Sequence, residues 1–125
     1  MSLVLDAGAL IALERDERAS WVRLKTAHTR GEVPLTNAAV LGQVWTGGPR
    51  QARLSRALAG MDIRPLDEGL GRAAGVLLSA TRRSDVIDAS IVLMANDGDE
   101  IITSDPEDLR PLAVATGIHV ELVHP

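Results

Sequence analysis

The hydrophobic positions of this chain form short apolar runs that alternate with longer stretches of helical periodicity. Residues 2–5 form the first run, which suits a parallel strand buried on both faces. Further extended pieces are predicted at residues 33–35, 61–66, 100–103 and 118–123. Strands separated by helices favour parallel pairing, so the pattern predicts an α/β fold with helices on both faces of the sheet.

The segments between these runs carry apolar residues at helical spacing. The predicted helices cover residues 7–13, 17–29, 51–59, 67–81, 84–96 and 105–116, and a further helix runs from Thr36 or Asn37 to a break at Gly47. In that further helix Trp45 belongs to the apolar side, and we expect it in the core, the alternative being an anchor for a partner or a second subunit. There is no internal repeat or linker, so residues 1–125 are interpreted as one domain.

Composition narrows the possible functions. Aromatic residues are 2% of the chain, which argues against the base-stacking platforms of RNA-recognition sheets. The absence of cysteine excludes disulfides, thiolate metal sites and a cysteine nucleophile. The net charge is −4, which argues against a protein that coats nucleic acid with a basic surface. The apolar start of the chain fits neither a signal peptide nor a membrane span, and we expect a cytoplasmic protein.

Carboxylates fall where the predicted strands end. Asp6 closes the first strand and Asp105 follows the fourth, while Asp85 and Asp88 share one face of the helix before the fourth strand. Ligands of parallel α/β sheets bind outside the carboxyl ends of the strands, so these acids are expected to converge. An oxygen-only set without histidine or cysteine suits Mg²⁺ or Mn²⁺.

Each of these acids also has a purely structural interpretation. Asp6, Asp85 and Asp105 all precede predicted helices, where an aspartate commonly serves as the N-cap. Asp88 is harder to explain in this way, because it interrupts an otherwise apolar helix between Ile87 and Ala89.

Three segments together resemble a known family. VLDAGALIAL at the start, DVIDASIVLMA in the middle and IITSDPEDL after it are similar to the three acidic motifs of PIN-domain nucleases, and the length resembles that of VapC-type toxins of bacterial toxin–antitoxin pairs. The resemblance implies a three-layer α/β/α fold with a central parallel sheet of four to five strands. It also implies a metal-dependent ribonuclease that uses Mg²⁺ or Mn²⁺, forms a homodimer and is controlled by a small cognate antitoxin.

Carried over residue by residue, the resemblance assigns both catalysis and metal binding to Asp6, Asp88 and Asp105. Asp85 and Asp108 would be supporting acids. In the implied mechanism the metal activates water for attack on an RNA phosphodiester.

One position departs from the family pattern. The family usually has a glutamate on the helix after the second strand, and this chain offers Gln43 there. An amide oxygen can touch a cation but brings no charge and cannot act as a base, so Gln43 is expected to weaken metal binding. Gln43 could equally be an ordinary polar helix residue.

Candidate RNA contacts are arginines. Arg82 and Arg83 stand just before the acidic helix and are the better candidates for RNA phosphates. The row of Arg50, Arg53 and Arg56 is more simply interpreted as a solvated helix face.

Two other functions compete with a ribonuclease. The first is a catalytically weakened PIN-like domain that binds RNA or a partner without cutting. The second is a receiver-like signalling domain, which fits poorly because such domains need a lysine late in the fold and the only lysine here is Lys25.

Overall fold

The computed structural model describes residues 1–125 and contains one parallel β-sheet of five strands. The strands are β1 (Leu3–Leu5), β2 (Leu35–Asn37), β3 (Asp62–Arg64), β4 (Glu100–Ile102) and β5 (Glu121–Val123). Their order is β3-β2-β1-β4-β5, and every neighbouring pair is parallel. The α/β fold expected from the sequence is confirmed.

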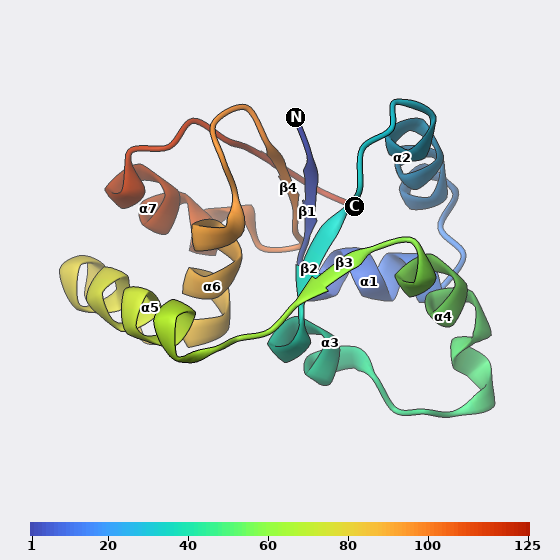
Figure 1. Cartoon of the computed structure of the whole chain (residues 1–125), viewed down its shortest axis with the longest axis horizontal. Coiled ribbons are helices and arrows are strands. Elements are labelled where there is room, and N and C mark those ends of the chain that lie inside the picture. Colours follow the sequence, from blue (N-terminus) through green and yellow to red (C-terminus); the bar gives the residue numbers. More distant parts are fainter.

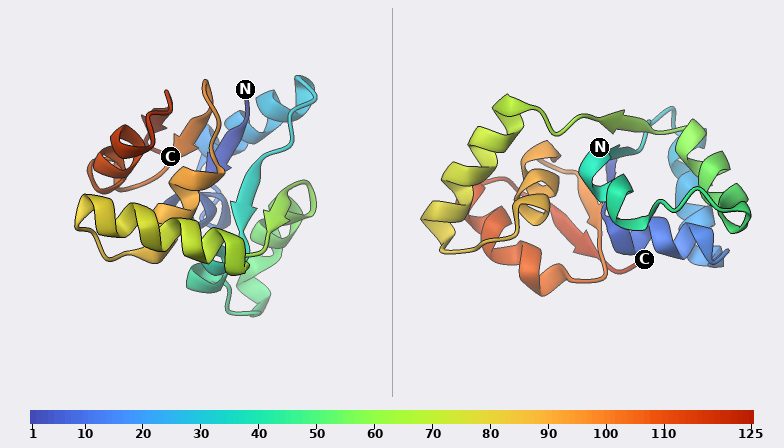
Figure 2. Two further views of the ribbon diagram at one scale, coloured as in Figure 1. Left: turned by 60° about the vertical axis from the view of Figure 1, so that its left-hand side comes forward. Right: turned by 90° about the horizontal axis from the view of Figure 1, so that it is seen from below.

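Helices cover both faces of this sheet (Figure 1). They are α1 (Ala7–Glu14), α2 (Arg18–Thr29), α3 (Ala38–Val44), the short 3-10 helix η1 (Pro49–Gln51), α4 (Ala52–Ala59), α5 (Glu68–Thr81), α6 (Val86–Met94) and α7 (Pro106–Thr116). Helices α5, α6 and α7 pack against one another in one layer, while α1 packs against α2, α3 and α4 in the other. The two views of Figure 2 show the same separation into three layers.

The core is aliphatic and centred on β1, all three residues of which are buried. Val4 lies between Leu35 of β2 and Ile101 of β4 in the parallel register. Branched aliphatic residues that are buried on both faces are typical of central parallel strands. The edge strand β3 is exposed along its length, as its mixed sequence Asp-Ile-Arg suggests.

The third helix is shorter than predicted. It ends at Val44, and Trp45 has an extended backbone with φ −75° and ψ 127°. Trp45 is therefore outside the helical register that would have turned it inward, and it is 44% exposed. The prediction that Trp45 belongs to the core is wrong.

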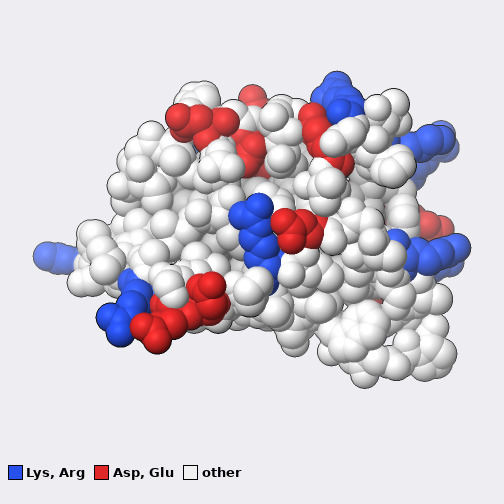
Figure 3. Space-filling model, viewed as in Figure 1, with Lys and Arg blue, Asp and Glu red and all other residues white.

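Charged side chains are distributed in small groups. On the face seen in Figure 3, acidic and basic side chains form separate small groups, and no continuous basic surface covers this side. None of the helices combines the length and the apolar character needed to cross a membrane.

Candidate metal centre

Asp6 lies at the carboxyl end of the central strand β1, where it also begins α1. Its Oδ1 accepts a hydrogen bond from the backbone N–H of Ala7 at 2.8 Å, and its Oδ2 accepts one from the hydroxyl of Thr103 at 2.9 Å. Only 7% of Asp6 is exposed. Asp6 therefore has the capping role that the sequence allowed, and its position at the end of the central strand also suits a site role.

Burial raises the pKa of the Asp6 carboxyl above its ordinary value of 3.8. The hydrogen bonds from Ala7 and Thr103 lower this pKa, whereas the nearby carboxylates of Asp105 and Asp85 raise it further. Asp6 is thus a buried acid whose negative charge is only partly stabilised by its own hydrogen bonds.

The amino end of α6 brings in two further acids. The Oδ1 of Asp85 accepts hydrogen bonds from the backbone N–H groups of Ile87 at 2.9 Å and Asp88 at 3.0 Å, so Asp85 is the N-cap of α6. The Asp88 carboxylate, one turn later, is half-buried and takes part in no hydrogen bond or ion pair. The structural interpretation accounts for Asp85 and leaves Asp88 unexplained.

Among these acids, Asp88 has the most strongly raised pKa. Its pKa is raised from 3.8 to about 6, first by desolvation and then by the negative charges of four aspartates: Asp85, Asp6, Asp108 and Asp105. Like charges that raise one another's pKa are relieved when a cation binds among them. The five aspartates from three separate segments therefore form one electrostatic unit, which we call the acidic cluster.

The loop after β4 completes the acidic cluster. Asp105 precedes α7 but makes no side-chain cap hydrogen bond. Instead, its backbone N–H donates to the hydroxyl of Thr103 at 3.1 Å, and the same hydroxyl donates to Asp6. Thr103 thus ties the two acidic loops together, while the carboxylate of Asp105 stays free to turn toward a cation.

A close backbone approach holds the same two loops in place. A Cβ atom added to Gly8 would lie 1.9 Å from the side-chain oxygen of Ser104 and 3.0 Å from its backbone nitrogen. The glycine in the first turn of α1 therefore lets the loop of Asp105 approach the loop of Asp6.

A pocket of about 220 Å³ opens beside the acidic cluster. It is lined by Arg83, Ser84, Asp85, Asp88, Asp108 and Leu112. Arg83 is the only basic residue among those that line this pocket. Its side chain is exposed and forms no ion pair. Of the two predicted phosphate contacts, Arg83 lies here. Arg82, which caps the carboxyl end of α5 in a left-handed conformation, does not line the pocket.

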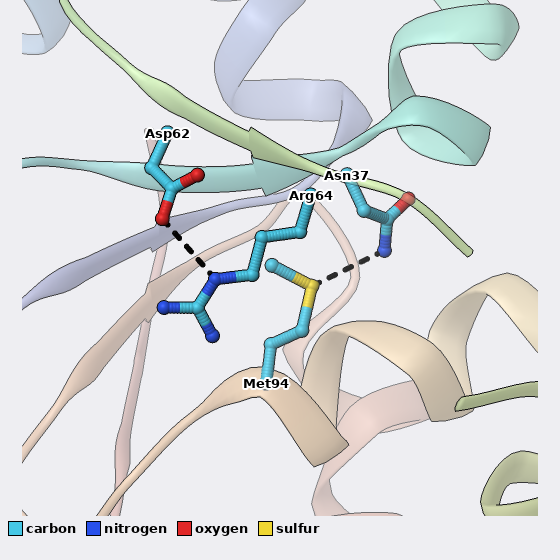
Figure 4. Close-up of polar contacts among 4 residues, drawn as sticks. All are labelled: Asn37, Asp62, Arg64 and Met94. Atoms are coloured by element: carbon cyan, nitrogen blue, oxygen red, sulfur yellow. Dashed lines mark hydrogen bonds and ion pairs between the residues drawn. The ribbon is translucent and has the colours of Figure 1, made fainter. Parts of the chain in front are cut away.

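The other side of the sheet's carboxyl end has no unpaired acid, because Asp62 of β3 pairs with Arg64 at 3.2 Å (Figure 4). Asn37 at the end of β2 is fully buried; its side chain caps α3 through Val40 and donates to Ser90 Oγ at 2.9 Å. It also donates to Met94 Sδ at 3.3 Å, the contact drawn in Figure 4. Gln43, further along α3, is exposed and makes no side-chain hydrogen bond to any member of the acidic cluster. The position where a glutamate was expected thus brings neither a charge nor a fixed contact.

The acidic cluster matches a hard divalent cation in chemistry. Its donors are carboxylate oxygens, and neither Asp88 nor Asp105 has an internal partner that a cation would have to displace. As the side chains stand, however, no three acids or histidines are close enough together to hold one ion. The carboxylates of Asp88 and Asp105 would have to turn inward on binding, toward the fixed carboxylate of Asp6.

One residue important to this site was missed by the sequence interpretation. Thr103 follows β4, and its hydroxyl links Asp6 to the loop of Asp105. A polar residue directly after a buried strand was the available signal, because such a residue lies at the carboxyl edge of the sheet. Asn37, which the sequence offered as a helix cap, is confirmed as the N-cap of α3 and also connects β2 to α6.

These features define an α/β protein with an acidic cluster at the carboxyl end of a five-stranded parallel sheet. No family model and no curated protein matches the sequence. Among solved structures, the fold is similar to a chain of VapBC2 from Rickettsia felis, which was crystallised bound to a DNA fragment from their promoter. The TM-score is 0.67 over 98% of each chain at 11% sequence identity. The protein therefore has a PIN-like fold; an identity this low concerns the fold alone.

Proposed function

We propose that this protein is a Mg²⁺- or Mn²⁺-dependent ribonuclease similar to VapC toxins. The observation that carries the proposal is the uncompensated charge of Asp88, whose pKa is raised to about 6 by burial and by four neighbouring aspartates. Clusters of perturbed acids at the carboxyl end of a parallel sheet mark functional sites. The fold likeness to VapBC2 supports the same proposal.

In this proposal, Asp6, Asp88 and Asp105 hold the cation. Asp6 is fixed by its two hydrogen bonds and sets the position of the centre, while Asp88 and Asp105 turn toward it. When bound, the cation supplies positive charge that makes water more acidic and neutralises a phosphodiester.

The other residues support this centre. Asp85 holds the first turn of α6 in place, and Thr103 orients the Asp6 carboxylate. Asp108 adds negative charge at the pocket wall, and Arg83 is placed to contact an RNA phosphate there. By the same similarity we propose a homodimer whose site is blocked by a small cognate antitoxin.

Cleavage of structured RNA with and without Mn²⁺ tests the proposal. Wild type should cut only with the cation, and Asp88→Asn should lose at least about a hundredfold in rate, since even outer-shell changes at metal sites cost up to that much. The matched control is Glu107→Gln, because Glu107 is an exposed acid near the site whose carboxylate pairs with Arg110. Equal cleavage by wild type and Asp88→Asn would eliminate this site.

A second candidate is an RNA- or partner-binding domain that does not cut. It is favoured by the neutral, exposed Gln43 and by the lack of three preassembled acidic ligands. Wild type would then bind RNA without cleaving it in Mn²⁺, and Gln43→Glu would be the change expected to restore cutting.

A further inference from the structure

Trp45 is a large aromatic side chain that the fold presents to solvent. Tryptophan is highly buried on average, yet Trp45 is 44% exposed directly after α3. The other tryptophan, Trp21, is half-buried and donates its ring N–H to the backbone oxygen of Leu13 at 3.1 Å. The ring N–H of Trp45 has no such acceptor in the protein. Exposure of this ring therefore needs a reason.

The backbone around Trp45 is held in place by the buried side chain of Gln51. Gln51 is 4% exposed, and its side-chain oxygen accepts hydrogen bonds from the backbone N–H groups of Thr46 at 2.8 Å and Gly47 at 3.0 Å. Its amide donates to the backbone oxygen of Val44 at 2.8 Å and to Glu14 Oε1 at 2.6 Å. Three of these four hydrogen bonds, to Val44, Thr46 and Gly47, thus hold the backbone on both sides of Trp45.

The same network connects the segment of Trp45 to α1, the helix that Asp6 begins. Glu14, which receives a hydrogen bond from Gln51, is the last residue of α1, and Asp6 is the N-cap of that helix. Helix α1 has eight residues and spans about 12 Å at 1.5 Å per residue. Helix α3 starts at the carboxyl end of the sheet, and Figures 1 and 2 show it at the same end of the molecule as the amino end of α6. Trp45 thus follows a helix that starts at the end of the sheet where the acidic cluster lies.

The surroundings of Trp45 fit a nucleic-acid base better than a protein partner. Stable protein interfaces bury about 800 Å² on each side and use several apolar anchors. Between residues 38 and 60, Trp45 is the only exposed large hydrophobic residue. Its neighbours Thr46, Gly47 and Gly48 offer no further anchor. A single base needs only one aromatic face for stacking.

A cation is available at the same segment. Arg50 in η1 is exposed and forms no ion pair, whereas Arg53 pairs with Asp16 at 3.7 Å. In proteins that bind single-stranded nucleic acid, a base commonly stacks on an aromatic ring while the adjacent phosphate meets a cation, and Arg50 offers such a cation five residues after Trp45.

We infer that Trp45 stacks on one base of single-stranded RNA and positions that strand across the acidic cluster. The inference rests on the proposed ribonuclease function, since the strand is the RNA substrate of that site. It assigns Trp45 a positioning role outside the reacting centre. One ring does not form the multi-aromatic platform that the composition argued against, and it gives the RNA a single point of base contact.

Fluorescence provides a direct test, because the chain has two tryptophans and no tyrosine. In full-length Trp21→Phe, Trp45 is the only strong emitter. A single-stranded oligoribonucleotide, added in EDTA and low salt so that no cutting occurs, should quench this emission. An abasic strand of equal length should not quench it, since it offers phosphates without bases.

Affinity measurements with labelled RNA in the otherwise wild-type chain do not depend on Trp21→Phe folding. Trp45→Ala should weaken binding roughly 5- to 150-fold, and Trp45→Phe should retain most of the affinity. The control is Val76→Ala, which removes an apolar side chain that is 73% exposed on α5, and it should change nothing.

Three outcomes would overturn the inference. Equal RNA affinity of Trp45→Ala and wild type, with Mn²⁺-dependent cleavage intact, would reject the stacking role and leave the ribonuclease proposal standing. Conversion of a dimer to a monomer by Trp45→Ala, with RNA affinity unchanged, would assign Trp45 to a subunit interface instead. Absence of both RNA binding and cleavage in wild type would reject this inference and the proposed function together.

Discussion

The two sides of the sheet's carboxyl end differ in what their polar groups bind. On the side of β1, β4 and α6, the carboxylates of Asp88 and Asp105 have no partner within the protein. On the side of β2 and α3, the side chain of Asn37 is satisfied by Val40, Ser90 and Met94. The first side therefore has carboxylates whose charge no cation balances, whereas on the second side the Asn37 side chain finds its hydrogen-bond partners within the protein.

This difference suggests that the two sides have separate roles, one in cation binding and the other in structural support. The charged side is arranged to bind a cation, and the other side supplies a rigid frame that carries Trp45. Because the carboxylates of Asp88 and Asp105 have no partner within the protein, substitutions at the site should largely separate stability from activity. The following predictions use that separation, beginning with the largest expected effect.

Asp6→Asn should abolish cleavage without weakening the fold. Metal-dependent activity should fall at least about a hundredfold with the loss of the central ligand. The free energy of unfolding should change little, because removal of the buried charge offsets the lost hydrogen bond from Thr103, while an amide oxygen can still cap Ala7. Cleavage assays and urea unfolding of the same preparations check both results. A large loss of stability would show that activity falls only because the chain unfolds.

Two glycine substitutions compare the two sides directly. Gly8→Ala should lower the free energy of unfolding by about 1–3 kcal/mol, since its Cβ would collide with Ser104. Gly42→Ala, in α3, should raise it by about 0.5–1 kcal/mol, because nothing lies within 4 Å and alanine is the better helix former. Urea unfolding measures both. Equal effects would mean that the loops of Asp6 and Asp105 are not held by this close approach.

The raised pKa of Asp88 predicts a pH dependence of stability. The folded chain binds a proton at Asp88 up to about pH 6, whereas the unfolded chain releases it near 3.8. Stability from this group is therefore complete below pH 3.8 and is lost as the pH rises toward 6. In EDTA, the free energy of unfolding of Asp88→Asn should fall less than that of wild type over this range. Parallel curves would contradict the raised pKa.

Gln43→Glu should add a carboxylate to the side of β2 and α3, which has no unpaired acid. A carboxylate on exposed α3 should tighten Mn²⁺ binding by up to about fivefold, the equivalent of roughly 1 kcal/mol for an exposed charge pair. Gln43→Ala is the control and should leave the affinity unchanged. Equal affinity of Gln43→Glu and wild type would place Gln43 outside the reach of the cation.

Local patterns were sufficient for the fold and for the location of the acids. Short apolar runs predicted the parallel strands, and the end of a strand predicted where Asp6 and Asp105 lie. Whether these acids bind a metal stays a prediction. The link between Asp6 and Thr103 spans 97 residues, and no local pattern reports a hydrogen bond across such a separation.

Trp45 was misplaced for a similar reason. Its helical spacing suggested burial, but the helix ends at Val44, and Gln51, several residues later, holds the backbone on both sides of Trp45 by hydrogen bonds. For Asp105, the difference from the prediction concerns hydrogen bonding and not burial. Its position predicted an N-cap side chain, yet Thr103 accepts the hydrogen bond from the Asp105 N–H and leaves the carboxylate free.

Mn²⁺ binding, measured by titration calorimetry in the absence of RNA, tests the central claim most directly. Wild type and Glu107→Gln should bind the cation with the same affinity, and Asp88→Asn and Asp105→Asn should each bind it at least about tenfold more weakly, as expected when a group that supports a metal site is removed. Unchanged Mn²⁺ affinity in both aspartate variants would contradict the claim that the acidic cluster is a metal site.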